Sequence, residues 1–411
     1  MIARKIKKGE LRRTFEIANI AFEASIFDLD VKDPIEDTLL SNAKDRFDLY
    51  CMERWASFLD DDHTMLGSFI AIPYEVYFDG NICLMRGVGA VSTLPQYRGL
   101  KAMENCMSKY LNDSYNAGDI FSSLFPFSRH FYQKFGYEFG SNVVFYSIDL
   151  RSIKKLPKEN KGTVEICICE NDINMLDFKK VYIEYRNSYN LSTYRKDIDF
   201  KFLYDINSKK QKRYIYLYKN TKKELKGIMI FEKKASGNGF NMECSHFYFS
   251  DNEGLLGLLD FCSSFSNYYD RVCFKAPENI RIPDILDDIT LYPIERQLYF
   301  NGMVRVVNVH KVLSMAKYRG SGTIIVKILD TIIDGNNKTF KLTFRDGKSL
   351  SVSIVDEPFD VELSINDFSR FILGTHDADE IIHMSGVNIN CSYEKLSQVF
   401  YKKPILITES F

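Results

Sequence analysis

Arg98 and Gly99 stand where a strand-like run ends and a helical one begins, and an anion could bind there. The stretch 87–103, GVGAVSTLPQYRGLKAM, has a strand pattern, a turn at Pro95 and then the spacing of a helix. The first N–H groups of a helix lack partners within it, and the helix dipole makes this end positive. A glycine admits close approach to the backbone, and an arginine adds charge. These residues predict a phosphate site, with an ordinary turn and a solvated Arg98 as the alternative.

The elements that must position this site alternate between helix and strand up to about residue 150. A helical run at 11–26 precedes two strand-like runs joined by the turn 79–81, and a helix from about 99 to 115 follows the site. Its apolar residues fall on one stripe, which predicts packing rather than chemistry. A strand, a short helix stopped at Gly136 and a further strand complete a mixed α/β region.

Two more regions follow a basic and polar stretch around Pro157 and Gly162. Residues from about 164 to 295 repeat the helix and strand pattern without a counterpart of Arg98 and Gly99, so we expect no second active site. The last region opens with MVRVVNVHKVLSM, continues with strands turned at Asp334-Gly335 and Asp346-Gly347, and ends in KKPILITESF. We therefore expect three domains, at residues 1–150, 151–295 and 296–411.

Composition narrows the class of protein. The chain has 411 residues, 45% hydrophobic and 27% charged, which fits a folded globular protein with more than one core. Its 54 basic and 55 acidic residues nearly cancel, so the net charge would not attract nucleic acid or an anionic membrane. We find no run of about 20 apolar residues that could span a membrane and no secretory signal. Nine cysteines without C-x-x-C spacing predict reduced thiols in the cytoplasm, and six histidines without ligand spacing predict no metal site.

Two segments resemble a known superfamily. Gln96-Tyr97-Arg98-Gly99 matches the front of the pyrophosphate motif Q/R-x-x-G-x-G/A, and PFSRHFYQKFGYEF resembles the F-Y-x-x-x-G-[FY] segment of the GNAT superfamily of acetyl-CoA-dependent N-acetyltransferases. In that superfamily the tyrosine matching Tyr132 protonates the departing thiolate. A phenol with a pKa near about 10 holds its proton at neutral pH and can donate it. Simple packing of a short helix is the alternative, and we prefer it for Phe131 and Phe135.

The whole layout resembles the enhanced intracellular survival (Eis) family. There, an acetyltransferase domain is followed by a second, degenerate one and by a domain similar to sterol carrier proteins, whose C-terminal carboxylate reaches the first domain's active site as general base. The resemblance implies an α+β (mixed α/β) fold: a catalytic GNAT domain at 1–150, a degenerate GNAT-like domain at 151–295, and a sterol-carrier-protein-like domain at 296–411 that ends at Phe411.

The resemblance also implies roles for particular residues. Tyr132 would be the general acid, and the carboxylate of Phe411 the general base. Acetyl-CoA would be the cosubstrate, bound by Val91, Ser92 and Thr93 along its arm, by Arg98, Gly99, Leu100, Lys101, Ala102, Met103 and Glu104 around its pyrophosphate, and by Phe127 and Ser128 further on. Lys101 departs from the family, which has glycine there, and its side chain could contact a phosphate or crowd it. Because a free α-carboxylate has a pKa near about 3.5, Phe411 would act best through water or once desolvated, and Glu409 could help attract a cationic amine.

The expected function is direct acetyl transfer to a primary amine, either an aminoglycoside-like molecule or a lysine side chain of a peptide. No motif marks the acceptor site. Phe22 and Trp55 could be its walls, although core packing is the favoured interpretation for each, and His130 is the one histidine near Tyr132. The alternative is a catalytically inactive ligand-binding or scaffolding protein that uses the sterol-carrier-like domain, with Lys101 as its best argument. The resemblance also implies a homo-oligomer, with a hexamer as its expected form.

Overall fold

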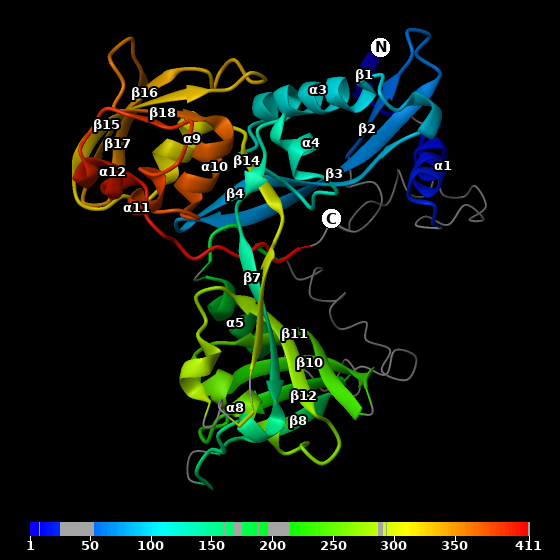
Figure 1. Cartoon of the computed structure of the whole chain (residues 1–411), viewed down its shortest axis with the longest axis vertical. Coiled ribbons are helices and arrows are strands. Elements are labelled where there is room, and N and C mark those ends of the chain that lie inside the picture. The colour runs from blue at the N-terminus through cyan, green and yellow to red at the C-terminus, as the bar shows by residue number, and fades with distance from the viewer. Residues whose placement is uncertain are drawn as a thin grey trace. The chain divides into compact units, whose positions relative to one another are not determined.

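The chain forms three β-sheets within the residues that the structure describes. The computed structural model describes residues 1–7, 9–24, 53–158, 161–167, 175–187, 189–195, 214–237, 239–286, 291–292 and 294–409. By its contacts the chain divides into two compact units, one of Met1–Ser141 with Gly302–Phe411 and one of Asn142–Asn301 (Figure 1). The first unit holds two of the sheets and the second unit holds one. The three-domain boundaries expected from the sequence stay a prediction.

The sheet that carries the candidate site has seven strands in the order β1-β2-β3-β4-β5-β14-β6. Its strands are β1 (Ile2–Lys5), β2 (Glu53–Phe58), β3 (Met65–Phe78), β4 (Asn81–Thr93), β5 (Phe121–Leu124), β6 (Glu138–Phe139) and β14 (Met303–Val306). Strand β14 follows β6 by more than 160 residues, yet it pairs antiparallel with both β5 and β6. The C-terminal part of the chain thus completes the sheet of the N-terminal part.

Two helices cover opposite faces of this sheet. Helix α1 (Leu11–Phe22) packs on β3 and β4, and α3 (Ala102–Ala117) packs on β1, β2 and β3. Neighbouring residues on a strand point to opposite faces, so Trp55 packs under α3 while Ala56 packs with α1. Trp55 is 2% exposed, which confirms core packing as its role. The short helices η1 (Pro95–Tyr97) and α4 (Arg129–Gln133) complete this part of the fold.

The second sheet of the first unit has five strands in the order β17-β16-β15-β18-β19. Its elements are β15 (Gly322–Leu329), β16 (Thr339–Arg345), β17 (Lys348–Ile354), β18 (Val361–Ser364) and β19 (Asn388–Ile389), with helices α9 (Val309–Met315), α10 (Ile365–Leu373), α11 (Ala378–Ile381) and α12 (Tyr393–Val399). The predicted turn at Asp346-Gly347 is confirmed: both residues have positive φ, at 50° and 78°, as a two-residue type I′ hairpin requires.

The second unit holds a seven-stranded sheet in the order β13-β7-β12-β11-β10-β9-β8. Its elements are β7 (Asn142–Asp149), η2 (Leu150–Ser152), β8 (Thr163–Cys167), α5 (Met175–Arg186), β9 (Tyr214–Lys219), β10 (Leu225–Ser236), β11 (Gly239–Phe249), α8 (Asn252–Ser263), β12 (Arg271–Pro277), η5 (Ile282–Ile285) and β13 (Glu295–Phe300). Strand β7 follows β6 closely in sequence but pairs with β12 and β13 in this sheet.

The described residues contain neither a membrane-spanning helix nor a cluster of metal-ligating side chains. None of their helices combines the length and the apolar character that crossing a membrane demands. No group of three or more histidine, cysteine, aspartate or glutamate side chains among them could hold a metal ion.

Candidate active site

Strands β4 and β5 separate in the middle of their sheet. Their parallel pairing ends at Val88 and Leu124, whereas β4 continues to Thr93 and stays paired there with Gly67 on β3. Among the described strands, none pairs with the β5-facing edge of residues 89–93. Backbone N–H and C=O groups need hydrogen-bond partners, so this edge can bind an extended ligand.

A β-bulge changes the direction of the β4 backbone where β4 separates from β5. Ser68 pairs with Ser92 and Ile70 pairs with Gly89, so Phe69 on β3 faces two residues of β4, Ala90 and Val91. Ala90 has a φ of 49°, a conformation that non-glycine residues adopt rarely. A bulge bends its strand and increases the local twist. This bulge could not be predicted from the sequence, because an alanine in a strand pattern does not mark a positive φ.

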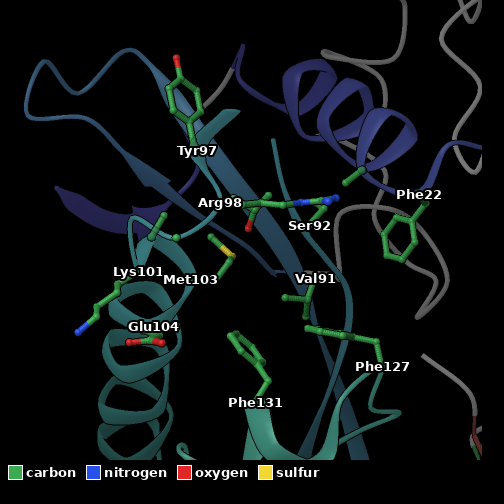
Figure 2. Close-up of a pocket in the computed structure, with 14 residues that line it drawn as sticks. Phe22, Val91, Ser92, Tyr97, Arg98, Lys101, Met103, Glu104, Phe127 and Phe131 are labelled. Atoms are coloured by element: carbon green, nitrogen blue, oxygen red, sulfur yellow. The ribbon is translucent and has the colours of Figure 1, made fainter. Parts of the chain in front are cut away.

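A pocket of about 570 Å³ opens beside this edge (Figure 2). Its lining residues are Ala21, Phe22, Val91, Ser92, Thr93, Tyr97, Arg98, Gly99, Lys101, Ala102, Met103, Glu104, Phe127 and Phe131. Of the residues predicted to bind the coenzyme, all line it except Leu100, whose side chain is 49% exposed, and Ser128. Sequence reasoning missed Ala21, Tyr97 and Phe131 as pocket residues. Tyr97 lies inside the motif, in a position that the motif leaves free.

The start of α3 forms the polar end of this pocket. No side chain caps the helix, and the N–H groups of Ala102, Met103 and Glu104 make no hydrogen bond within the described part of the chain. Gly99 has a φ of 87°, and a side chain built there would meet nothing within 4 Å. Arg98 is exposed beside it. Free amides and the helix dipole favour an anion at this end of the pocket. The Arg98 side chain extends from here toward α1 and Phe22 and adds positive charge to the pocket (Figure 2).

Lys101 stands at the N-cap of α3 in the left-handed region, with a φ of 58°. This is the conformation that glycine adopts at little cost and that other residues pay about 1 kcal/mol to adopt. Its amine points away from Val91 and Phe127 and outward from α3 (Figure 2). The lysine therefore keeps the backbone shape that glycine favours, and its side chain does not fill the pocket.

Tyr132 lies behind the pocket, in a cluster of aromatic rings. It is 2% exposed, does not line the pocket, and contacts Phe127, Phe131 and Tyr137 at ring distances of 5.4, 5.1 and 6.3 Å. No hydrogen bond joins its hydroxyl to another residue that the structure describes. Burial raises the pKa of Tyr132 above its ordinary value, and Tyr137 adds to the shift. This phenol therefore holds its proton at neutral pH.

The aromatic neighbours of Tyr132 differ in their roles. Phe135 is 2% exposed and packs in the core, as expected. Phe131 also packs against the core, but it lines the pocket as well. Phe127 is 72% exposed at the pocket, and Ser128 caps α4 by accepting a hydrogen bond from the Phe131 N–H, at 3.3 Å.

Two further candidates from the sequence lie at the edge of the site or outside it. Phe22, at the end of α1, is 47% exposed and lies on the same side of the pocket as Phe127, opposite Lys101 and Glu104 (Figure 2). It is therefore a pocket residue rather than a core residue, because α1 ends there and turns its last side chain outward. His130 is exposed on α4 and does not line the pocket.

The last described residues run toward the separated strands. Ile405, Leu406 and Ile407 are at most 9% exposed. A side chain built on Gly302, just before β14, would lie 3.2 Å from the Ile407 side chain and 3.2 Å from the carbonyl oxygen of Leu124, at the end of β5. Glu409 is half-buried. Phe411, the predicted general base, lies outside the described residues.

Comparisons with known proteins agree with this architecture. Residues 3–140 match the family described as an acetyltransferase (GNAT) domain, and residues 309–406 match the family described as a sterol carrier protein domain. No curated protein matches the sequence.

Solved structures match over nearly the full length. A probable N-acyltransferase of unknown function from Enterococcus faecalis V583 has 19% sequence identity and a TM-score of 0.82, with 100% of this chain and 99% of that one covered. Eis1 from Mycobacterium abscessus has 14% identity and a TM-score of 0.78, with 100% of both chains covered. A GCN5-related N-acetyltransferase from Anabaena variabilis has 18% identity and a TM-score of 0.80, with 98% of both covered. At these identities the matches show a shared fold. The expected α+β fold, with GNAT-like domains followed by a sterol-carrier-protein-like domain, is confirmed.

Proposed function

We propose that this chain, a GNAT N-acetyltransferase with a C-terminal sterol carrier protein domain, transfers the acetyl group of acetyl-CoA directly to a primary amine. One observation carries the proposal. A single pocket joins Arg98, the amides at the start of α3 that no described residue binds, and the edge of β4 that no described strand pairs with. An anion site and an open strand edge are the two features needed to hold a pyrophosphate and the amide-containing arm attached to it.

In this proposal the pyrophosphate lies against Ala102, Met103 and Glu104, whose N–H groups are free, and Arg98 adds charge. The pantetheine arm pairs with the backbone of Val91, Ser92 and Thr93 along the edge that β5 leaves unpaired. Phe127 and Ser128 flank the coenzyme further on. The side chain of Lys101 points away from this path (Figure 2), so it leaves room for the coenzyme.

The chemistry needs one proton removed and one supplied. A neutral amine attacks the thioester carbonyl, the new C–N bond forms, the C–S bond breaks, and the thiolate takes a proton. Tyr132 supplies that proton, because burial keeps its phenol protonated. Free backbone N–H groups of the β4 edge stabilise the negative charge that develops on the carbonyl oxygen.

The carboxylate of Phe411 would take the proton from the attacking amine. This role stays a prediction from the family resemblance, because Phe411 lies outside the described residues. The burial of Ile405–Ile407 close to Gly302 supports a tail that runs toward the site. Glu409 would help to attract a cationic acceptor.

The acceptor in this proposal is a small-molecule or peptide amine, either an aminoglycoside-like molecule or a lysine side chain. Phe22 and Phe127 are exposed on the side of the pocket away from the start of α3 (Figure 2), where aromatic faces could contact an alkyl amine. No observation favours the alternative of an inactive ligand-binding or scaffolding protein, since its best argument was crowding by Lys101.

Location and assembly belong to the proposal as well. No disulfide joins the cysteines that the structure describes, which are Cys83, Cys106, Cys167, Cys244, Cys262, Cys273 and Cys391. This supports a reducing compartment and a cytoplasmic location. A homo-oligomer, with a hexamer as its expected form, rests on the resemblance to the Eis family. Light scattering of the purified protein tests this assembly.

The deciding experiment measures thiol release from acetyl-CoA with an aminoglycoside, a lysine peptide and a polyamine. We expect release that depends on an amine and falls by about 10²–10⁴-fold in Tyr132→Phe and also in a variant that lacks Phe411. Tyr268→Phe is the matched control, because Tyr268 is 75% exposed in the other unit. No release with any amine, together with no binding of acetyl-CoA, would contradict the proposal.

A further inference from the structure

We propose that Asn366, on α10 of the sterol-carrier-like part, is a positioning residue that holds Tyr132 in place. This inference rests on the proposed role of Tyr132 as general acid. Nothing in the coenzyme motif points to Asn366, which follows Tyr132 by more than 200 residues. Asn366 contacts the backbone turn that leaves α4 directly after Tyr132.

That turn reverses the chain within five residues. The Gly136 N–H donates to the carbonyl oxygen of Gln133, at 3.0 Å, and the Tyr137 N–H donates to that of Tyr132, at 3.3 Å. Gly136 has a φ of 80°, so the turn is a Schellman motif with glycine in the left-handed position. The predicted helix stop at Gly136 is thus confirmed, and the shape of the turn fixes the backbone on which Tyr132 stands.

Asn366 closes this turn from outside. Its side-chain amide donates one hydrogen bond to the carbonyl oxygen of Gln133, at 2.9 Å, and the other to that of Tyr137, at 3.0 Å. Both N–H groups of one amide therefore bridge the two ends of the turn. Each bond to a neutral carbonyl contributes about 1 kcal/mol.

A second side chain from the same part of the chain, Arg305, binds the middle of the turn. The guanidinium of Arg305, on β14, donates to the carbonyl oxygen of Phe135 and forms an ion pair of 2.6 Å with Asp330, and both side chains are 0% exposed. A side chain at Gly136 would collide with Arg305 and with Ile365 at the start of α10. The turn therefore lies between β14 and α10, which are neighbours in the fold (Figure 1).

The contacts that hold the turn also affect the Tyr132 phenol, because the Tyr137 ring packs against it. The Tyr137 ring contacts that of Tyr132, and its hydroxyl is held by Ser122 at 2.7 Å. No hydrogen bond joins the hydroxyl of Tyr132 to another described residue. Its position thus depends on its backbone and on its ring contacts. A small displacement of a catalytic group can cost about 100-fold in rate.

The test compares Asn366→Ala with a matched control. Asn112 on α3 also joins the two parts of the first unit, because its amide donates to the carbonyl oxygen of Ile332, at 3.0 Å, but it does not touch the turn. We expect Asn366→Ala to lower kcat about tenfold with little change in the KM for acetyl-CoA. Asn112→Ala should leave both unchanged. Equal losses of kcat in the two variants would overturn the proposal, because they would indicate a general structural effect.

A double variant separates positioning from stability. If Asn366 acts through Tyr132, then Asn366→Ala added to Tyr132→Phe should lower kcat no further than Tyr132→Phe alone. Losses that multiply would overturn the positioning role while leaving the general acid in place. A Tyr132→Phe variant as active as the wild type would instead contradict the proposed function of Tyr132, and the positioning role with it.

Hydrogen exchange tests the contact without any activity. We expect the amides of Gly136 and Tyr137 to exchange faster in Asn366→Ala than in the wild type or in Asn112→Ala, since both belong to the turn that Asn366 closes. Unchanged exchange would overturn the proposal, whatever the acceptor amine proves to be. Arg305 is unsuitable for this test, because removing one partner of a buried ion pair destabilises a protein by about 3 to 5 kcal/mol.

Discussion

Lys403 and Asp79 form an ion pair in which the Nζ and Oδ2 atoms lie 2.6 Å apart, with side chains only 5% and 7% exposed. Asp79 lies in the turn between β3 and β4, at the far end of the strand that carries the candidate site. Lys403 precedes the buried residues Ile405–Ile407, and it also donates to the carbonyl oxygens of Lys317 and Ile372. The pair therefore fastens the last part of the chain to the sheet of the site.

Replacing one partner of this pair should cost much of the stability of the first unit. Asp79→Asn leaves the Lys403 charge buried without its counter-charge, which typically costs about 3 to 5 kcal/mol. Asp79 has a φ of 49°, and asparagine tolerates this conformation, so the backbone is not the cause of the loss. Urea unfolding followed by Trp55 fluorescence measures it, because Trp55 is the chain's single tryptophan and is buried in this unit.

The control for the ion pair is the double variant Asp79→Asn with Lys403→Met. Removing both charges leaves no buried ion, so we expect most of the lost stability to return. If Asp79→Asn unfolds at the same urea concentration as the wild type, water must reach the Lys403 amine. The ion pair would then not stabilise the attachment of the last part of the chain.

Arg98 should contribute to binding of acetyl-CoA rather than to the chemical step. Arg98→Gln removes a guanidinium that lines the pocket, so we expect a KM for acetyl-CoA about tenfold higher, a kcat within about twofold, and a weaker dependence of KM on salt. Steady-state kinetics at two salt concentrations provide the measurement. Arg12→Gln is the control, since Arg12 is an exposed arginine at the other end of α1 from the pocket and pairs with Glu16. A fall in kcat with an unchanged KM would contradict the assignment.

Lys101 should matter for backbone strain more than for charge. Lys101→Gly removes the strain of the left-handed conformation from the folded state, which is about 1 kcal/mol. The greater conformational entropy of glycine in the unfolded state offsets part of this gain. Lys101→Ala removes the charge and keeps the strain. Because the amine points away from the pocket (Figure 2), we expect both variants to bind acetyl-CoA within about threefold of the wild type, with Lys101→Gly the more stable of the two. Calorimetric titration and thermal unfolding measure these quantities. Weaker binding in both variants by tenfold or more would make the lysine a phosphate contact.

The elements whose signals are local could be predicted from the sequence. Gly99 before α3, Gly136 after α4 and the Asp346-Gly347 turn all stand where the structure places a positive φ. The predicted helix from about residue 99 begins at Ala102, because the left-handed backbone of Gly99 and Lys101 delays its first turn.

The long-range relations could not be predicted. The pattern of residues 303–306 is typical of a strand, but it does not specify the sheet that the strand joins. The pairing of β14 with β5 and β6 depends on which strand edges are free once the whole chain has folded. The bulge at Ala90 and the hydrogen bonds of Asn366 likewise have no pattern in the sequence. The pocket could therefore be predicted from its motif, but the contacts that hold Tyr132 could not.

Burial of Tyr132 should make stability depend on pH in the alkaline range. The pKa of the buried phenol lies above its ordinary value near about 10, so the folded chain keeps a proton that the unfolded chain releases. The unfolded state then binds fewer protons, and the free energy of unfolding falls as pH rises. The contribution is complete below pH about 10 and is lost above it, at about 1.4 kcal/mol per pH unit for one group.

Tyr132→Phe isolates this contribution, because no hydrogen bond joins the hydroxyl to another described residue and its loss should change stability at pH 7 little. Burial also raises the pKa values of Tyr110 and Tyr137, so the wild type loses stability through several groups and the measured quantity is the difference in slope between variant and wild type. Urea unfolding from pH 7 to 11 should give a shallower alkaline slope for Tyr132→Phe. Equal slopes would mean that the Tyr132 phenol ionises as readily in the folded chain as in the unfolded one, and burial would then not explain a retained proton.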